Sequence, residues 1–215
     1  MTWRGRPAGV VLALGPAVYT AYMFAQYIAG PAYQYYPRVL TFHLALFVLA
    51  GSIGTSAWSA TKTVRLPMLP HRQARRHAIV LVLLAAFVVS RYVPALIDSW
   101  NDRRLAGEHV REPAMYWSVV LLDLGVVVPV TVAAAGALWR SARDATKLLY
   151  GVVGCFALVP PSVAAMGITE IVNSDPEASV SRTVCLGLAA LVFALYAVWL
   201  DVRLARRCYP RPQES

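Results

Sequence analysis

The stretch "AIVLVLLAAFVVSRYVPALID", residues 78–98, contains only two charged residues, Arg91 and Asp98. A helix of about twenty apolar residues is long enough to cross the hydrocarbon core of a bilayer. A soluble chain carries about a quarter charged residues, whereas this one is 14% charged and 58% hydrophobic over its 215 residues. The stretch therefore predicts a membrane-spanning helix.

Five further apolar runs of this length occur along the chain. The six runs cover residues 9–29, 39–58, 78–98, 115–138, 148–169 and 183–201. The first run follows a basic start, as in a signal peptide, but no clear cleavage site of small residues comes after it, so we interpret it as a span. We expect an all-α bundle of six transmembrane helices, forming a single domain over residues 1–215.

The basic residues are distributed unevenly between the two sides that six crossings would create. Fourteen of the twenty Lys and Arg residues fall on the side of the termini: Arg4, Arg6, Lys62, Arg65, Arg72, Arg75, Arg76, Arg140, Arg143, Lys147, Arg203, Arg206, Arg207 and Arg211. Cytoplasmic loops of membrane proteins carry an excess of Lys and Arg. We therefore expect both termini in the cytoplasm.

The same distribution bears on partners and location. A basic cytoplasmic face suits the lipid bilayer, and in particular anionic lipid headgroups, so the net charge of +9 does not indicate nucleic-acid binding. Arginine is far more abundant than lysine, and alanine and valine are frequent, which is typical of GC-rich bacterial genomes. We expect a multi-pass protein of the bacterial cell (cytoplasmic) membrane.

One acidic residue lies inside an apolar run. In "VVLLDLGVVVPV", residues 119–130, Asp123 has aliphatic or small neighbours, and an unpaired charge at such depth costs at least about 2.5–3.5 kcal/mol. With a rise of about 1.5 Å per residue, Asp123 lies roughly 5 Å to the outer side of the midplane, and Arg91 on the antiparallel third span reaches a similar depth. We expect Arg91 and Asp123 to face each other, either as a lock between two helices or as part of a ligand or ion site. A proton relay through His43, Asp123 and the tyrosines is the third interpretation.

Other polar residues reach the same level. Tyr19, Tyr22 and Gln26 share one face of the first span, His43 lies near the outer end of the second, and Glu170 follows the prolines of the fifth. The inner halves of the spans are less polar, which predicts a pocket open to the outer side. The candidate ligand-binding residues are Arg91, Asp123, His43, Tyr19, Tyr22, Gln26 and Glu170.

Prolines and small residues predict irregular, closely packed helices. Pro16, Pro94, Pro129 and the pair Pro160–Pro161 lie within spans, and each removes a helical hydrogen bond. The pair is the strongest indication of a bend or break. Small residues such as those of "AGSIGTSAWSA" permit close helix approach, in a tight bundle or in a homo-oligomer.

No motif of a soluble enzyme is present. The chain contains no P-loop, GxSxG, HExxH or dinucleotide fingerprint, and its three cysteines form no CxxC or Cys/His metal spacing. We therefore predict no catalytic residue, no metal and no cofactor.

The order of four segments is similar to that of a known group of proteins. The segments are "AYMFAQYIAGPAYQYYP", "RYVPALID", "YWSVVLLDLGVVVPVTVAAAGALW" and "SVAAMGITEIVNSDPEAS". Together they resemble a family of uncharacterised multi-pass membrane proteins of actinobacteria. The resemblance covers most of the chain and implies its fold and location, but no catalytic residues, because that group has no established activity. Where the group has a Gly-Asn pair after the tyrosine-rich "YP", this chain has "RVL".

Three functions are compatible with these observations. The first is a small transporter, channel or ligand-binding membrane protein, with a small ligand entering from the outer side to a site around Arg91 and Asp123. The second is a structural or accessory subunit with a membrane partner, in which these two residues only lock helices together. The third is an intramembrane lipid-modifying enzyme using His43, Glu170 or Asp98, and the absence of a metal site or nucleophile places it last.

Overall fold

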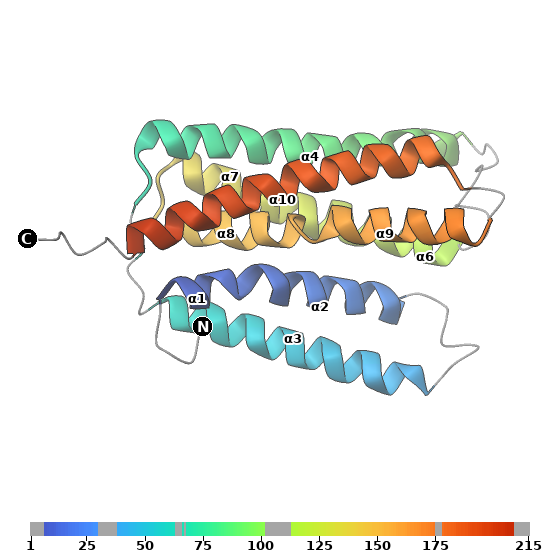
Figure 1. The fold of residues 1–215 in the computed structure, drawn as a ribbon, viewed down its shortest axis with the longest axis horizontal. Coiled ribbons are helices and arrows are strands. Elements are labelled where there is room, and N and C mark those ends of the chain that lie inside the picture. The colour runs from blue at the N-terminus through green and yellow to red at the C-terminus, as the bar shows by residue number, and fades with distance from the viewer. Residues whose placement is uncertain are drawn as a thin grey trace, which may run out of the picture. The chain divides into compact units, whose positions relative to one another are not determined.

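The structure is a computed structural model that describes residues 7–29, 38–62, 66, 68–101, 113–174 and 178–208. Within these ranges the chain forms helices and turns, with no strand (Figure 1). The helices are α1 (Pro7–Leu12), α2 (Leu14–Ala29), α3 (Val39–Thr61), α4 (His71–Trp100), α6 (Pro113–Leu122), the π-helical turn η3 (Asp123–Val127), α7 (Val128–Trp139), α8 (Ala145–Phe156), α9 (Val159–Val172) and α10 (Val180–Cys208).

Six helical segments are long and apolar enough to cross a bilayer. They are Gly9–Ile28, Val39–Thr61, His71–Trp100, Pro113–Trp139, Ala145–Val172 and Thr183–Leu204. The all-α class and the number of spans predicted from the sequence are thus confirmed. The largest difference is at the third span, where α4 begins at His71 rather than near residue 78, because helix-compatible polar residues continue it back to Pro70.

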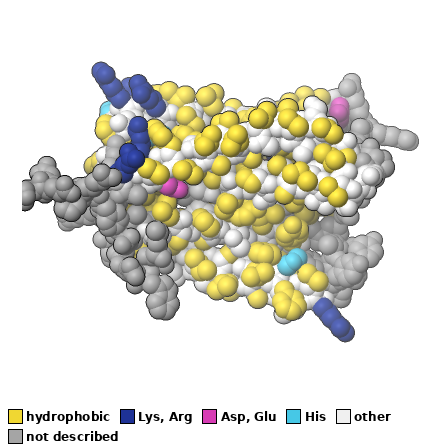
Figure 2. All heavy atoms as spheres, in the orientation of Figure 1, with side chains coloured by type: hydrophobic (Ala, Val, Ile, Leu, Met, Phe, Trp, Pro, Cys, Tyr) yellow, Lys and Arg dark blue, Asp and Glu magenta, His cyan; other side chains and the backbone are white. Residues whose placement is uncertain are grey.

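Large apolar side chains point away from the protein along several helices. Phe42 of α3 is 71% exposed, and Val192 of α10 is 64% exposed. Hydrophobic side chains line the helices, whereas Lys and Arg side chains gather at helix ends (Figure 2). In water such surfaces would associate, whereas in lipid they contact acyl chains. These surfaces are those of a multi-pass membrane protein.

The chain divides into two compact units. Unit 1 comprises Met1–Tyr19, Ala50–Met68 and Thr146–Ser215. Unit 2 comprises Thr20–Leu49 and Leu69–Ala145.

Unit 1 is held together by close contacts between small residues. A Cβ atom built on Gly15 of α2 would lie 2.6 Å from the Cα of Gly154 on α8, so only glycine allows this approach. Gly167 of α9 similarly packs against the side chain of Thr183 on α10. The Tyr150 hydroxyl donates a hydrogen bond to the Leu200 carbonyl at 3.3 Å. Helices without a hydrophobic driving force between them associate through such packing.

Unit 2 is built on the pairing of α4 with α7. Seven of the nine buried residues of α4 recur in a pattern that repeats every seven residues: Ala74, Ala78, Leu81, Ala85, Val88, Tyr92 and Ala95. This spacing places them on one stripe of the helix. The stripe faces the partner helix, whose buried residues are Thr131, Ala134, Ala135 and Leu138.

Most of the prolines within spans accompany a departure from α-helix. The fifth span is interrupted at Ala157–Leu158, just before Pro160–Pro161, as the sequence predicts. The first span is interrupted at Ala13, before Pro16, and the fourth contains η3, before Pro129. A proline ring clashes with the carbonyl four residues earlier, which explains why each irregularity precedes its proline. Pro94 is the exception, because α4 continues through it.

Candidate functional site

Asp123 is the first residue of η3, and both oxygens of its carboxylate accept hydrogen bonds. The Tyr22 hydroxyl, from α2, donates to Oδ1 at 2.6 Å. The Tyr92 hydroxyl, from α4, donates to Oδ2. All three residues belong to unit 2. The carboxylate is therefore held by neutral donors from two other helices.

The backbone at Asp123 departs from α-helix for a local reason. The N–H of Val128 donates to the carbonyl of Asp123, five residues earlier. The next residue, Pro129, has no N–H and cannot supply a bond to the preceding turn. One turn further on, the Thr131 hydroxyl donates to the Val127 carbonyl at 2.7 Å. Single π turns of this kind are frequent at functional sites.

Tyr92 is enclosed by aromatic and cationic groups. Its side chain is 4% exposed. The Tyr116 ring of α6 meets it edge-on, with 6.2 Å between the ring centroids, and the Arg91 guanidinium carbon lies 5.7 Å from the Tyr92 ring centroid. The Tyr92 hydroxyl is thereby fixed toward Asp123.

Arg91 occupies a different place from the one the sequence suggested. Its side chain is exposed, and among the described residues it contacts the Tyr92 ring and makes no ion pair with Asp123. The stripe of α4 explains this, because Tyr92 lies on the stripe and its neighbour Arg91 is turned away from it by about 100°. The two carboxylate oxygens of Asp123 accept hydrogen bonds from tyrosine hydroxyls and not from Arg91.

The remaining candidates of unit 2 lie along α2 and α3. The His43 ring is 5.3 Å from the ring of Phe24 and 5.3 Å from that of Tyr27, between centroids. Gln26 is buried and follows Tyr22 by one helical turn, which places both on one face of α2.

Tyr19 and Glu170 belong to unit 1. The hydroxyls of Tyr19 and Ser162 share a hydrogen bond between α2 and α9. Glu170 lies half-buried near the end of α9. The structure thus brings Tyr22 and Asp123 into direct contact, and it places Tyr19 and Glu170 among the residues of unit 1.

Tyr92 is the residue of the site that the sequence prediction missed. The signal was present, because Tyr92 falls on the seven-residue repeat of small and apolar residues in α4. The adjacent Arg91 carries the charge in this segment but lies one residue off the stripe.

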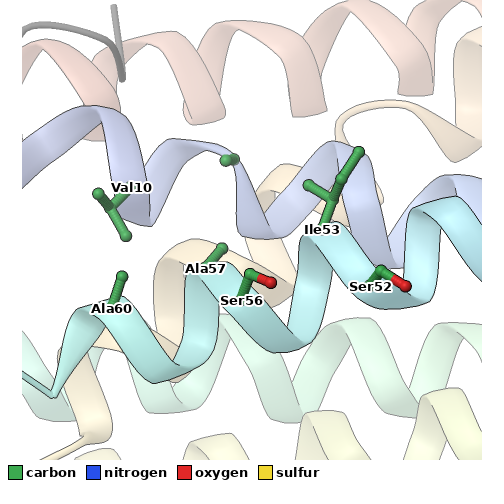
Figure 3. A pocket seen from close by; sticks show the side chains of 7 residues that line it. Val10, Ser52, Ile53, Ser56, Ala57 and Ala60 are labelled. Carbon is green, nitrogen blue, oxygen red and sulfur yellow. The ribbon is translucent and has the colours of Figure 1, made fainter.

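A shallow groove of about 390 Å³ lies within unit 1, between α3 and the N-terminal helices (Figure 3). Its lining includes Val10, Ala13, Ile53 and the two serines Ser52 and Ser56. None of its lining residues is ionisable, so this groove cannot contribute charge to a site. Within the described ranges, no three His, Cys, Asp or Glu side chains are grouped so as to hold a metal ion.

Comparison with known proteins adds no further constraint. No protein-family model matches the chain, and neither a curated protein nor a solved structure matches it.

Proposed function

We propose that the chain is a small transporter of a bacterial cytoplasmic membrane, and that Asp123, with Tyr22 and Tyr92, binds its cationic substrate or coupling ion. One observation carries this proposal: a carboxylate within the apolar length of a span is held on both oxygens by phenols at a π turn. Ionisable residues inside spans commonly mark ion or proton pathways. Interrupted helices also line the ion sites of transporters.

The composition of the site favours a single positive charge. Asp123 is the carboxylate of this cluster, and both tyrosines are neutral donors that keep hydroxyl lone pairs for a cation. Divalent calcium takes six to eight oxygen ligands, often from several carboxylates. A proton or a monovalent cation, arriving from the outer side, therefore fits the cluster best.

Stability measurements on the purified protein test this proposal. We expect one of Na⁺, K⁺ or Li⁺ to raise the melting temperature relative to N-methyl-D-glucamine, because a ligand at 100 times its Kd stabilises by about 2.7 kcal/mol. Asp123→Asn should abolish the effect, whereas Asp98→Asn, a matched acid on α4, should retain it. If the ligand is a proton, infrared difference spectra across a pH step should show a carboxyl band that is missing only in Asp123→Asn. The absence of both responses would overturn the proposal.

The distribution of basic residues supports a membrane orientation for this transporter. Fourteen of the twenty Lys and Arg residues fall on the side of the termini, and such residues remain on the cytoplasmic side. We therefore place both termini in the cytoplasm, with the basic face against anionic lipid headgroups.

A second function, that of a structural or accessory subunit, is favoured by the same hydrogen bonds. Both oxygens of Asp123 are already engaged, and they join η3 to α2 and α4. In this role the double variant Tyr22→Phe with Tyr92→Phe should lower the amount of protein in the membrane. The wild-type protein should then show no response to ions and should co-purify with a partner in mild detergent.

A further inference from the structure

A second feature of unit 2 is independent of Asp123 and of the proposed transport. A groove of about 420 Å³ lies between α4 and α7. Small residues keep it open, namely Ala78 on one side and Ala135 and Gly136 on the other. A Cβ atom built on Gly136 would meet nothing within 4 Å. The other lining side chains are also apolar, so the groove suits an apolar occupant.

One end of this groove is strongly basic. Trp139 lines the groove, and the Arg75 guanidinium carbon lies 5.2 Å from the Trp139 ring centroid. Arg72 and Arg75 precede Ile79 by seven and four residues, so they continue the same face of α4. Arg140 directly follows Trp139 and is exposed. The apolar surface therefore leads into a cluster of guanidinium groups, at the end where α4 begins (Figure 2).

Within the described part of the chain, no carboxylate forms an ion pair with the three arginines of this cluster, Arg72, Arg75 and Arg140. The first turn of α4 also lacks a side-chain cap, so its N–H groups add to the positive potential. An anionic group is the complement of this surface.

We infer that the groove between α4 and α7 binds an anionic phospholipid, with an acyl chain against Ile79, Val82 and Gly136 and the headgroup against Arg72, Arg75 and Arg140. The occupant must be apolar along the groove and negative at its basic end. A phospholipid with a net negative headgroup combines both properties, and basic pockets between membrane helices are known to bind such headgroups. The cation–π contact of Arg75 with Trp139 fixes one guanidinium at the boundary between the two parts.

Native mass spectrometry of the full chain in mild detergent tests this inference. We expect dioleoylphosphatidylglycerol to remain bound where dioleoylphosphatidylcholine does not. Arg72→Gln, Arg75→Gln and Arg140→Gln should each weaken binding by about five-fold, as expected for one basic residue near an anionic headgroup. Arg38→Gln, at the start of α3, serves as the matched control and should bind as the wild type does. Equal binding of the two lipids would overturn the inference.

A second variant separates the groove from general effects of charge. Gly136→Leu should fill the groove and remove bound phosphatidylglycerol while leaving the arginines in place. Gly187→Leu is its matched control, because a Cβ atom on Gly187 of α10 also meets nothing within 4 Å. Unchanged lipid binding in Gly136→Leu would overturn the inference. So would the finding that Gly136→Leu dissociates a second copy of the chain rather than a lipid.

Discussion

At the scale of single residues, the Asp123 carboxylate is supported by phenols and not by a cation. Hydrogen bonds to a charged group contribute about 1.5–3 kcal/mol, whereas neutral bonds between membrane helices average about 0.6 kcal/mol. Tyr92 is nearly fully buried and is fixed by its neighbours Tyr116 and Arg91. Its hydroxyl should therefore contribute more to stability than an ordinary phenol in a span.

Removing that hydroxyl provides a direct test. We expect Tyr92→Phe to lower the free energy of unfolding by about 1–3 kcal/mol, because the Asp123 carboxylate loses a donor inside the span. Denaturation in mixed micelles measures the change. Tyr27→Phe is the control, since the Tyr27 ring packs on His43 and its hydroxyl makes no hydrogen bond to a described residue. An equal loss in both variants would contradict the expectation.

A comparison of Arg91 with Asp123 tests which groups support the site. Arg91→Leu should lower the free energy of unfolding by no more than about 0.5–1 kcal/mol, because Arg91 is exposed and its described contact is the cation–π interaction with Tyr92. Asp123→Leu should lower the free energy of unfolding by more than Arg91→Leu does, because two tyrosine hydroxyls lose their acceptor. The same unfolding assay measures both. A greater loss for Arg91→Leu would indicate that the two charges act as a pair.

The sequence was sufficient to single out Asp123 and Tyr22, but not to identify Tyr92. Asp123 stands out because its neighbours are apolar, and depth along a helix follows from counting residues. Depth alone does not give the rotation of a helix about its axis, and Arg91 and Tyr92 differ mainly in rotation. That rotation is set by packing against α7, through the stripe that contains Tyr92.

At the scale of elements, small residues and prolines decide where helices approach and where they break. The interruptions before Pro16 and Pro160 and the π turn before Pro129 all lie within spans. The Leu158 carbonyl, at the break before Pro160, accepts both the backbone N–H of Ser162 at 3.3 Å and the Ser162 hydroxyl at 3.0 Å. Backbone groups at such depth need protein partners because water is absent from the bilayer core. The sequence predicted the break at Pro160–Pro161, whereas α4 continues through Pro94 without a break.

The contact of α2 with α8 gives a prediction at this scale. Gly15→Ala should destabilise the protein by about 1–3 kcal/mol, because the new methyl group would lie 2.6 Å from the backbone of Gly154. Backbone atoms cannot relieve this clash by a change of rotamer, as a side chain could. Thermal unfolding in detergent measures this change. The matched control is Gly51→Ala, where the added Cβ atom meets nothing within 4 Å. Equal melting temperatures for the two variants would show that α2 and α8 do not approach so closely.

At the scale of the whole molecule, six spans and the placement of basic residues define the expected topology. The spans follow from the lengths of the apolar runs, which is why the sequence alone located them. The start of α4 was harder to locate, because the basic residues after Pro70 are helical without being apolar. The orientation of the termini follows from the distribution of Lys and Arg residues between the two sides of the membrane.

Reporter fusions measure that orientation. With both termini in the cytoplasm, a green fluorescent protein fused after Ser215 should fluoresce, and alkaline phosphatase at the same position should be inactive. A fusion placed after Trp100, at the end of the third span, should show the opposite pattern. Phosphatase activity at the C-terminus would reverse the assigned orientation.

The π turn at Asp123–Val127 gives the fourth span a property that α4 lacks. A π turn accommodates one residue more than an α-helical turn of the same rotation. Loss of one residue within η3 would therefore convert it to regular α-helix, while α6 and α7 keep the faces they present to their neighbours. The same deletion within α4 would turn every later side chain by about 100° and remove Tyr92 from Asp123. Single-residue deletions that arise in evolution should therefore be tolerated best at η3. A deletion there alters the surroundings of the Asp123 carboxylate but leaves the packing of α6 and α7 unchanged.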